Sequence, residues 1–202
     1  IVMDFGTEVF YSTPRLQDCP RPPCPKRLDR AGSRLAGCSD PLPAYREACY
    51  ALADGPKTAA AVFRVPSGDQ PLPKTPEVLA CHFGGSLEDT TAGSADELHP
   101  SHRAFRVSHR LLDRVRMDGF PLMTKSIFSC DTEITVSLID EHSPRALICA
   151  PLGLGEGFVV LLYVDVPIDG RTQPGPEEMF AFTQAVARLV QRTTARILGT
   201  AQ

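Results

Sequence analysis

The sequence lacks several features that assign a protein directly to a functional class. Its 202 residues include no tryptophan, and 21 lysine and arginine residues nearly balance 24 aspartate and glutamate residues, for a formal net charge of −3. That balance gives no general positive field to attract nucleic acid or an anionic membrane. No apolar run approaches the roughly 18 to 20 residues that a membrane-spanning helix needs. We therefore expect a soluble globular domain that binds neither nucleic acid nor membrane.

Familiar catalytic motifs are missing as well. No Gly-x-Ser-x-Gly sequence is present to hold a serine nucleophile on a strained turn. Residues 152–157 carry alternating glycines, but they lack the Gly-Lys-Ser/Thr ending and precede an apolar run, which favours a hairpin turn over a phosphate loop. Cys149 and His142 could in principle form a catalytic Cys-His pair. Cys149 lies within an apolar run, however, so we expect it to be a buried core residue. We expect no catalytic residue and no enzymatic activity in this chain.

The seven cysteines form no recognisable metal or disulfide pattern. Cys19, Cys24 and Cys38 lie near one another, but there is no Cys-x-x-Cys and the first histidine is His82, so four ligands cannot gather locally. An odd count argues against a complete disulfide framework. We expect reduced thiols in a cytoplasmic protein and no metal site. A metal, a Cys19–Cys24 disulfide and redox sensing remain as alternatives.

Prolines, by contrast, are abundant and unevenly placed. Four of the 19 prolines crowd residues 20–25, where a fixed φ and a missing N–H disfavour both helix and central strand. We therefore expect residues 1–42 to be a Pro-rich linker or extended segment and residues 43–202 to be the folded domain. The chain begins Ile1-Val-Met-Asp, from which we expect one module of a longer multidomain protein.

Apolar spacing within residues 43–202 predicts an α+β fold. Helices are expected at residues 43–52, 101–117 and 176–198. Strands are expected at residues 58–65, 77–83, 133–139, 145–151 and 157–166, the first two pairing as an antiparallel hairpin. The economical arrangement is an antiparallel sheet of five to six strands with helices packed mainly on one face and a long C-terminal helix.

Two of the expected helices have recognisable ends and faces. Ser101 is expected to cap the second helix, and Pro176 is expected to open the last one. The inward residues of the second helix are predicted to be Phe105, Leu111, Leu112 and Val115. Its other side is predicted to be a solvated stripe of Arg103, Arg106, Arg110 and Arg114.

The C-terminal half resembles a GAF domain. Arg145-Ala-Leu-Ile-Cys-Ala-Pro-Leu152, followed by Gly157-Phe-Val-Val-Leu-Leu-Tyr-Val-Asp165, is similar to the family's small-residue Val/Ala-Pro-Leu strand, hairpin and Gly-Val-Leu strand leading to an acidic position. Glu177-Glu178-x-x-x-Phe-x-Gln-Ala-Val-Ala-Arg resembles the family's closing helix. The resemblance covers about residues 43–198 and is closest to GAF modules of bacterial multidomain regulators.

This resemblance implies a noncatalytic sensory or regulatory domain with a cupped pocket over the sheet. It also implies a homodimer through the terminal helices, for which we expect contacts at Val186 and Leu189, and a fused output domain. A small ligand, or a rearrangement of the dimer, would bias the last helix between two arrangements. The residues expected to line the pocket are Phe63, His82, Phe105, His109, Phe120, Cys149 and Tyr163.

Departures from the family's patterns limit the choice of ligand. The cyclic-nucleotide-binding signature is absent. Cys81-His82 is similar to the adjacent Cys-His of bilin-binding GAF domains, but it lies in an apolar strand without the flanking family residues. Bilin and haem are therefore not expected, and no cofactor is assigned. Two alternative functions remain: a small cysteine-dependent redox enzyme similar to free methionine sulfoxide reductases, and a dimerisation module whose pocket is filled by side chains.

Overall fold

The computed structural model describes the chain over residues 10–12, 24–55, 58–84, 106–126, 132–133, 145–168 and 175–199. Its helices are α1 (Pro25–Ala36), α2 (Pro41–Leu52), α3 (His109–Asp118) and α4 (Pro176–Ile197). Its strands are β1 (Phe10–Ser12), β2 (Ala59–Pro66), β3 (Glu77–Phe83), β4 (Arg106–Val107), β5 (Leu122–Ser126), β6 (Thr132–Glu133), β7 (Arg145–Gly155) and β8 (Phe158–Pro167).

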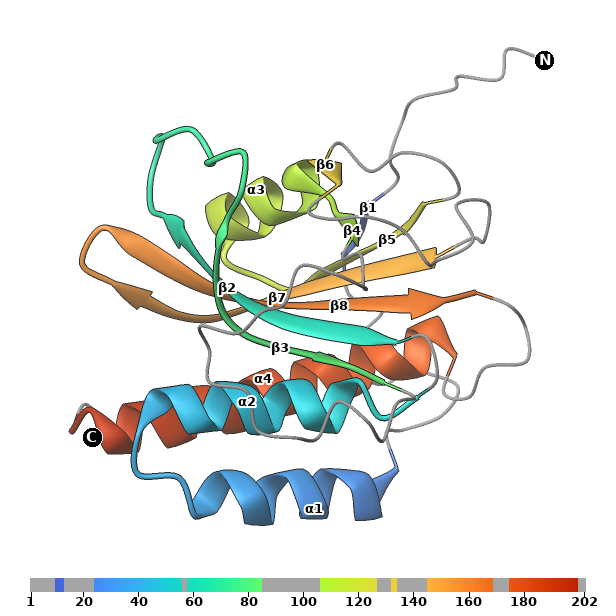
Figure 1. The fold of residues 1–202 in the computed structure, drawn as a ribbon, viewed down its shortest axis with the longest axis vertical. Coiled ribbons are helices and arrows are strands. Elements are labelled where there is room, and N and C mark those ends of the chain that lie inside the picture. Colours follow the sequence, from blue (N-terminus) through green and yellow to red (C-terminus); the bar gives the residue numbers. More distant parts are fainter. Residues whose placement is uncertain are drawn as a thin grey trace.

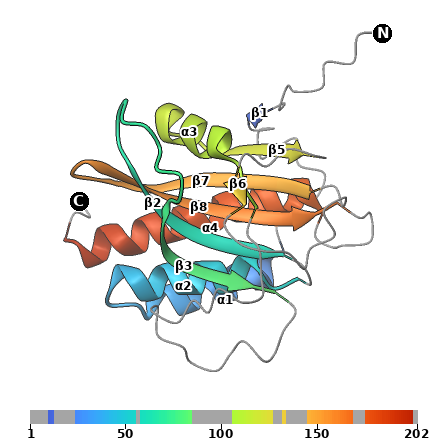
Figure 2. The ribbon, with the colours of Figure 1, turned by 45° about the horizontal axis from the view of Figure 1, so that its top comes forward.

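Six of these strands form one sheet in the order β1-β5-β7-β8-β2-β3, and every neighbouring pair is antiparallel. Strands β4 and β6 pair separately. Helices α2 and α4 lie against one face of the large sheet, α1 lies beneath those two helices, and α3 lies on the opposite face (Figures 1 and 2). The predicted α+β class is confirmed, with its antiparallel sheet, helices mainly on one face and long C-terminal helix.

The β7–β8 hairpin is the centre of the sheet. Nearly every residue from 145 to 152 and from 159 to 167 is buried, because the sheet is covered on both faces. The predicted hairpin is confirmed, but its turn is shorter than expected, since β7 continues to Gly155. Gly157 has φ 79°, a left-handed value that glycine adopts without strain.

The strands outside the β7–β8 hairpin match the sequence predictions to different degrees. Strands β2 and β3 lie within one residue of their predicted bounds and pair antiparallel as expected. Strand β5 was not predicted, because its Leu122-Met-Thr-Lys-Ser126 sequence has too few apolar residues to show a clear period. Of the strand predicted at 133–139, only Glu133 lies within the described residues, in β6.

Helix α3 begins later than the sequence suggested. Ser108, and not Ser101, is its N-cap, and the Ser108 Oγ accepts a hydrogen bond from the Leu111 N–H at 3.2 Å. Arg106 lies in strand β4, so the prediction that it belongs to a helical arginine stripe is wrong. Leu111, Leu112 and Val115 face inward as predicted.

Residues 25–36 correct the expectation of an extended N-terminal segment. They form helix α1, with Pro25 in the first turn, where a missing N–H costs nothing. The buried positions Ala31 and Leu35, and the half-buried Leu28, follow the three- and four-residue helical spacing that the dense prolines obscured. Where the domain begins therefore stays a prediction, but α1 packs on its core.

Helix α1 runs parallel to α4. The Arg27 guanidinium lies 4.8 Å from the centre of the Phe182 ring, near the start of both helices. At the other end, Arg196 Nη2 donates to the carbonyl oxygens of Ala36 at 3.0 Å and Cys38 at 3.1 Å. These contacts hold both ends of α1 against α4.

The residues expected to form the homodimer contact are buried or half-buried within a single chain. Val186 is fully buried and Leu189 is half-buried, with Gly32 of α1 facing Leu189. The α4 face that was expected to meet a second copy is therefore covered within one chain. A homodimer through Val186 and Leu189 requires α1 to move away.

The core has two parts, one on each face of the sheet. The larger apolar cluster lies between the sheet and α1, α2 and α4, and the smaller lies between the sheet and α3. No helix in the described ranges combines the length and apolar character needed to cross a bilayer.

A substitution in α1 tests whether this helix belongs to the folded domain. Leu35 is 1% exposed. Leu35→Ala should lower the free energy of unfolding toward the low end of the ~2–5 kcal/mol typical of buried leucines, because α1 lies at the periphery and relaxes easily. Urea unfolding measures the change. Lys26→Ala, at an exposed position of the same helix, is the control, and equal unfolding midpoints for the two variants would show α1 detached.

Candidate functional site

Three of the predicted pocket residues meet beneath α3. Phe63, Cys149 and Tyr163 all belong to the apolar cluster on this face and are at most 1% exposed. The Phe63 and Tyr163 rings contact edge to face, with centroids 5.8 Å apart. The Tyr163 hydroxyl accepts a hydrogen bond from the Ser108 N–H at 3.0 Å, at the start of α3. These residues therefore form packed core between the sheet and α3.

His82 lies on the other face of the sheet. Along β3, Cys81 points toward the α3 side, so its neighbour His82 points toward the helical layer. There its ring stacks on Tyr50 of α2, with centroids 4.1 Å apart. The expectation that His82 lines one pocket with Phe63 and Tyr163 does not match this geometry, because strand alternation separates them.

The remaining predicted residues are dispersed. His109 occupies the first turn of α3 and is half-buried. Phe120 follows the end of α3 and is 42% exposed. Phe105 lies outside the described residues. Of the predicted residues that are described, the structure thus brings Phe63, Cys149 and Tyr163 together and places His82 on the opposite face of the sheet.

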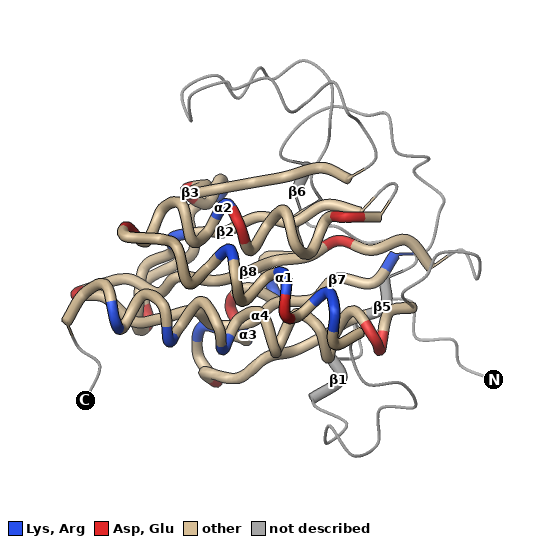
Figure 3. The backbone as a smooth tube through the Cα atoms, turned by 90° about the horizontal axis from the view of Figure 1, so that it is seen from below, with Lys and Arg blue, Asp and Glu red and all other residues tan. Residues whose placement is uncertain are grey.

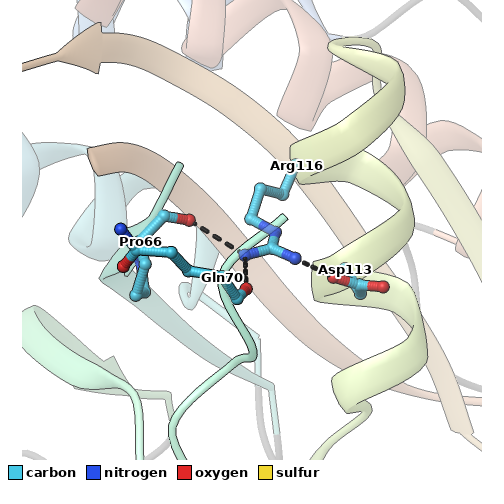
Figure 4. Close-up of polar contacts among 4 residues, drawn as sticks. All are labelled: Pro66, Gln70, Asp113 and Arg116. Carbon is cyan, nitrogen blue, oxygen red and sulfur yellow. Dashed lines mark hydrogen bonds and ion pairs between the residues drawn. The ribbon is translucent and has the colours of Figure 1, made fainter. Parts of the chain in front are cut away.

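A shallow groove of about 380 Å³ runs between α3 and the β2–β3 loop. Arg116, whose side chain is 5% exposed, fixes the loop by donating to the carbonyl oxygens of Pro66 at 3.1 Å and Gln70 at 2.5 Å (Figure 4). Its other terminal nitrogen donates to Asp113. The groove is lined by Asp69, Gln70, Pro71, Leu72, His109, Arg110, Asp113 and Arg116. The groove is open and carries both acidic and basic side chains, so its charge favours neither an anionic nor a cationic ligand.

The α3 face of the sheet has a polar end. Arg145, at the start of β7, donates from Nε to the Asp165 carboxylate near the end of β8, and their side chains are 2% and 0% exposed. Asp165 lies two residues beyond Tyr163 along β8, past the N-terminal end of α3. Of the helices in the described ranges, only α3 lies on this face.

Thr124 adds a buried hydroxyl to the same end. It pairs with Leu147, which pairs with Asp165, so the three residues form one cross-strand row on this face. Thr124 is fully buried, and its Oγ1 has no hydrogen-bond partner in the described part of the chain. A buried hydroxyl without a partner is costly, so this position is suited to a group that supplies one. We call Thr124, Arg145 and Asp165 the polar end.

Sequence reasoning did not identify the polar end as a site. Arg145 and Asp165 were noticed only as the ends of two apolar runs. A signal was present, because Asp165 interrupts the longest apolar run at an inward-facing position. The register that places it beside Arg145 depends on the turn at residues 156–157, and that turn was expected over residues 152–157.

The thiols of Cys49, Cys81 and Cys149 are poor candidates for redox or nucleophilic chemistry. Burial raises the pKa of both Cys49 and Cys149 well above the ordinary thiol value, and it also raises the pKa of Cys81. Because the thiolate is the reactive form, these shifts suppress reactivity near neutral pH. In the described ranges, no three His, Cys, Asp or Glu side chains gather to hold a metal ion.

The known proteins that are similar to this chain are solved structures. No family model matches the chain, and no curated protein matches it. Among the solved structures that match is the GAF domain from a phosphoenolpyruvate-protein phosphotransferase of Coxiella burnetii, which is 14% identical. That match covers 87% of this chain and 96% of the other chain, with a TM-score of 0.44.

The buried ion pair gives a stability test. Asp165→Leu removes the carboxylate beside a buried guanidinium and should destabilise the fold by about 3–5 kcal/mol. Arg145→Met together with Asp165→Leu should recover most of that loss, because apolar residues of similar size can replace a buried pair. Urea unfolding of both variants measures the coupling. Equal losses in the single and double variants would show that the two side chains are not coupled.

Thiol burial gives a labelling test. A raised pKa means that the folded chain holds the thiol proton more tightly than the unfolded chain, so this stabilisation is lost as the pH rises through the folded pKa. At about pH 8, iodoacetamide should label the exposed Cys24 and leave Cys49 and Cys149 unmodified. In urea all three should react. Peptide mass spectrometry locates the labels, and rapid native labelling of Cys149 would contradict its burial.

Proposed function

We propose that this chain is a noncatalytic sensory or regulatory domain of the GAF type, which binds a small ligand at the polar end and relays binding through α4. Two things support the GAF assignment. The strand and helix sequences of residues 145–188 resemble the family. The elements from α2 to α4 also follow the predicted order of helix, strand pair, helix, strands and long terminal helix.

The single observation that carries the ligand proposal is the polar end itself. A buried ion pair stabilises a fold weakly compared with apolar residues of the same size, so stability alone does not account for Arg145 and Asp165 in an apolar sheet. Thr124 adds a hydroxyl whose hydrogen-bonding capacity is unused among the described residues. A ligand with hydrogen-bonding groups would satisfy Thr124 and use the charges beside it. The class of ligand this favours is a small polar metabolite.

Helix α4 is placed to sense such a ligand. It packs against β7 and β8 on the face opposite the polar end. Gln191 Nε2 also donates to the Pro151 carbonyl oxygen of β7 at 2.9 Å. A ligand that shifts β7 relative to β8 would therefore bias the position of α4. Control of a fused output domain through α4 belongs to this proposal.

The homodimer belongs to the proposal with one structural condition. Val186 is buried in the core and Gly32 of α1 faces Leu189, so a dimer must either use another surface or displace α1. The cysteine-dependent redox alternative has no comparable support, because burial raises the pKa of the described buried thiols.

Thermal shift against nucleotides, amino acids and small carboxylates tests ligand binding. A ligand at about 100 times its Kd should stabilise the native state by about 2.7 kcal/mol, which raises Tm. Thr124→Val should keep the ligand-free Tm or raise it, since it removes an unpartnered buried hydroxyl, and should reduce the ligand-induced shift.

Thr183→Val is the matched control. Thr183 is also fully buried, but it lies in α4 and its Oγ1 donates to the Met179 carbonyl oxygen at 2.7 Å. This variant should keep the full ligand-induced shift. Ligand-induced shifts of equal size in the two valine variants would place the ligand elsewhere, and a panel without any shift would favour a domain that works without a ligand.

A further inference from the structure

We propose that the C-terminal halves of α1 and α4 form a docking surface for an acidic protein segment. Residues 30–38 and 186–198 contain five arginines and no aspartate or glutamate. We call these arginines the basic surface: Arg30, Arg34, Arg188, Arg192 and Arg196. Figure 3 views the helical layer from this side, with the basic positions of α1 and α4 in blue. The surface lies across the sheet from the polar end, so the proposal does not depend on the proposed ligand.

The five arginines belong to two neighbouring helix ends, because α1 and α4 run parallel. Gly32 faces Leu189, and the carbonyl oxygens of Ala36 and Cys38 accept from Arg196. The C-terminal half of one helix therefore lies beside the C-terminal half of the other. Arg30, Arg34, Arg188, Arg192 and Arg196 are all exposed.

Little of this charge is balanced locally. Arg34 lies 3.4 Å from Glu47 of α2, in an ion pair whose side chains are 55% and 31% exposed. Arg196 is bonded to backbone carbonyls, which leaves its charge without a carboxylate in the described ranges. Arg188 and Arg192 make no hydrogen bond or ion pair with any described residue. The basic surface is thus a concentrated positive region on a chain whose net charge is −3.

The spacing of the α4 arginines indicates the shape of the partner. Arg188, Arg192 and Arg196 are four residues apart, so their Cα atoms rise by about 6 Å per step along one side of the helix. Carboxylates at four-residue intervals on a second helix have the same spacing, and arginine pairs with carboxylate through two hydrogen bonds. Leu198, 65% exposed just beyond the last arginine, offers an apolar contact at the end of the row.

Charge also argues against other occupants. A second copy pairing through the same face would place arginine against arginine, which is repulsive. The rest of the chain is strongly negative, because the overall charge is −3 despite these five arginines. That negative field repels a long polyanion or an anionic membrane that extends past the basic surface. A short acidic segment fits within it.

Fluorescence anisotropy of the whole chain with a labelled 20-residue helical peptide tests the proposal. The peptide carries glutamate at every fourth position and one leucine. We expect saturable binding that weakens about tenfold or more in Arg188→Glu/Arg192→Glu, with Tm unchanged because both side chains are exposed. The charge-reversed variant should instead bind the matching peptide with lysine in place of glutamate.

Arg46→Glu/Lys74→Glu is the matched control, since it changes the net charge equally at exposed positions outside the basic surface. It should keep the affinity of the parent chain. If both double variants lost peptide affinity equally, the effect would come from net charge and not from the basic surface, and the proposal would be overturned. Absence of peptide binding would overturn it as well. So would tighter binding of a 20-nucleotide single-stranded DNA, or of phosphatidylserine-containing vesicles, than of the acidic peptide.

Discussion

Burial of both faces of the β7–β8 hairpin is the constraint on which the rest of the structure depends. The two strands lie at the centre of the sheet, and their apolar side chains alternate between two clusters. An apolar strand pair with both faces buried needs a layer on each side. Helix α4 supplies one layer and α3 the other, so the positions of both helices follow from the composition of the hairpin.

The helices in the described part of the chain are distributed unequally over the two faces of the sheet. Three helices cover one face, where α1 closes over α2 and α4 and leaves an apolar interior. Of the helices in the described part of the chain, only the ten-residue α3 lies on the opposite face. The buried Arg145–Asp165 pair and Thr124 lie on this second face, beyond the start of α3.

Sequence periodicity predicted the parts of the fold that depend on local patterns. Strand β8 and helix α4 are long and strongly patterned, so their type and place were correct. Helix α1 was missed because the prolines at residues 20–25 dominated a short amphipathic pattern. The face of His82 was missed because β3 has apolar residues on both sides of it, which hides the alternation. The Arg145–Asp165 pair could not be predicted, because it depends on the pairing register of β7 and β8. A turn longer or shorter by one residue would shift that register.

Helix α4 joins the two proposed activities in one rigid element. One side of it packs on β7 and β8, directly across the sheet from the polar end. Its C-terminal half exposes Arg188 and Arg192, and Arg196 ties it to the end of α1. A shift of the hairpin would therefore move the arginine row together with the end of α1. Since the strength of charge pairing depends on the match in spacing, even a small displacement of α4 would alter its fit to an acidic partner.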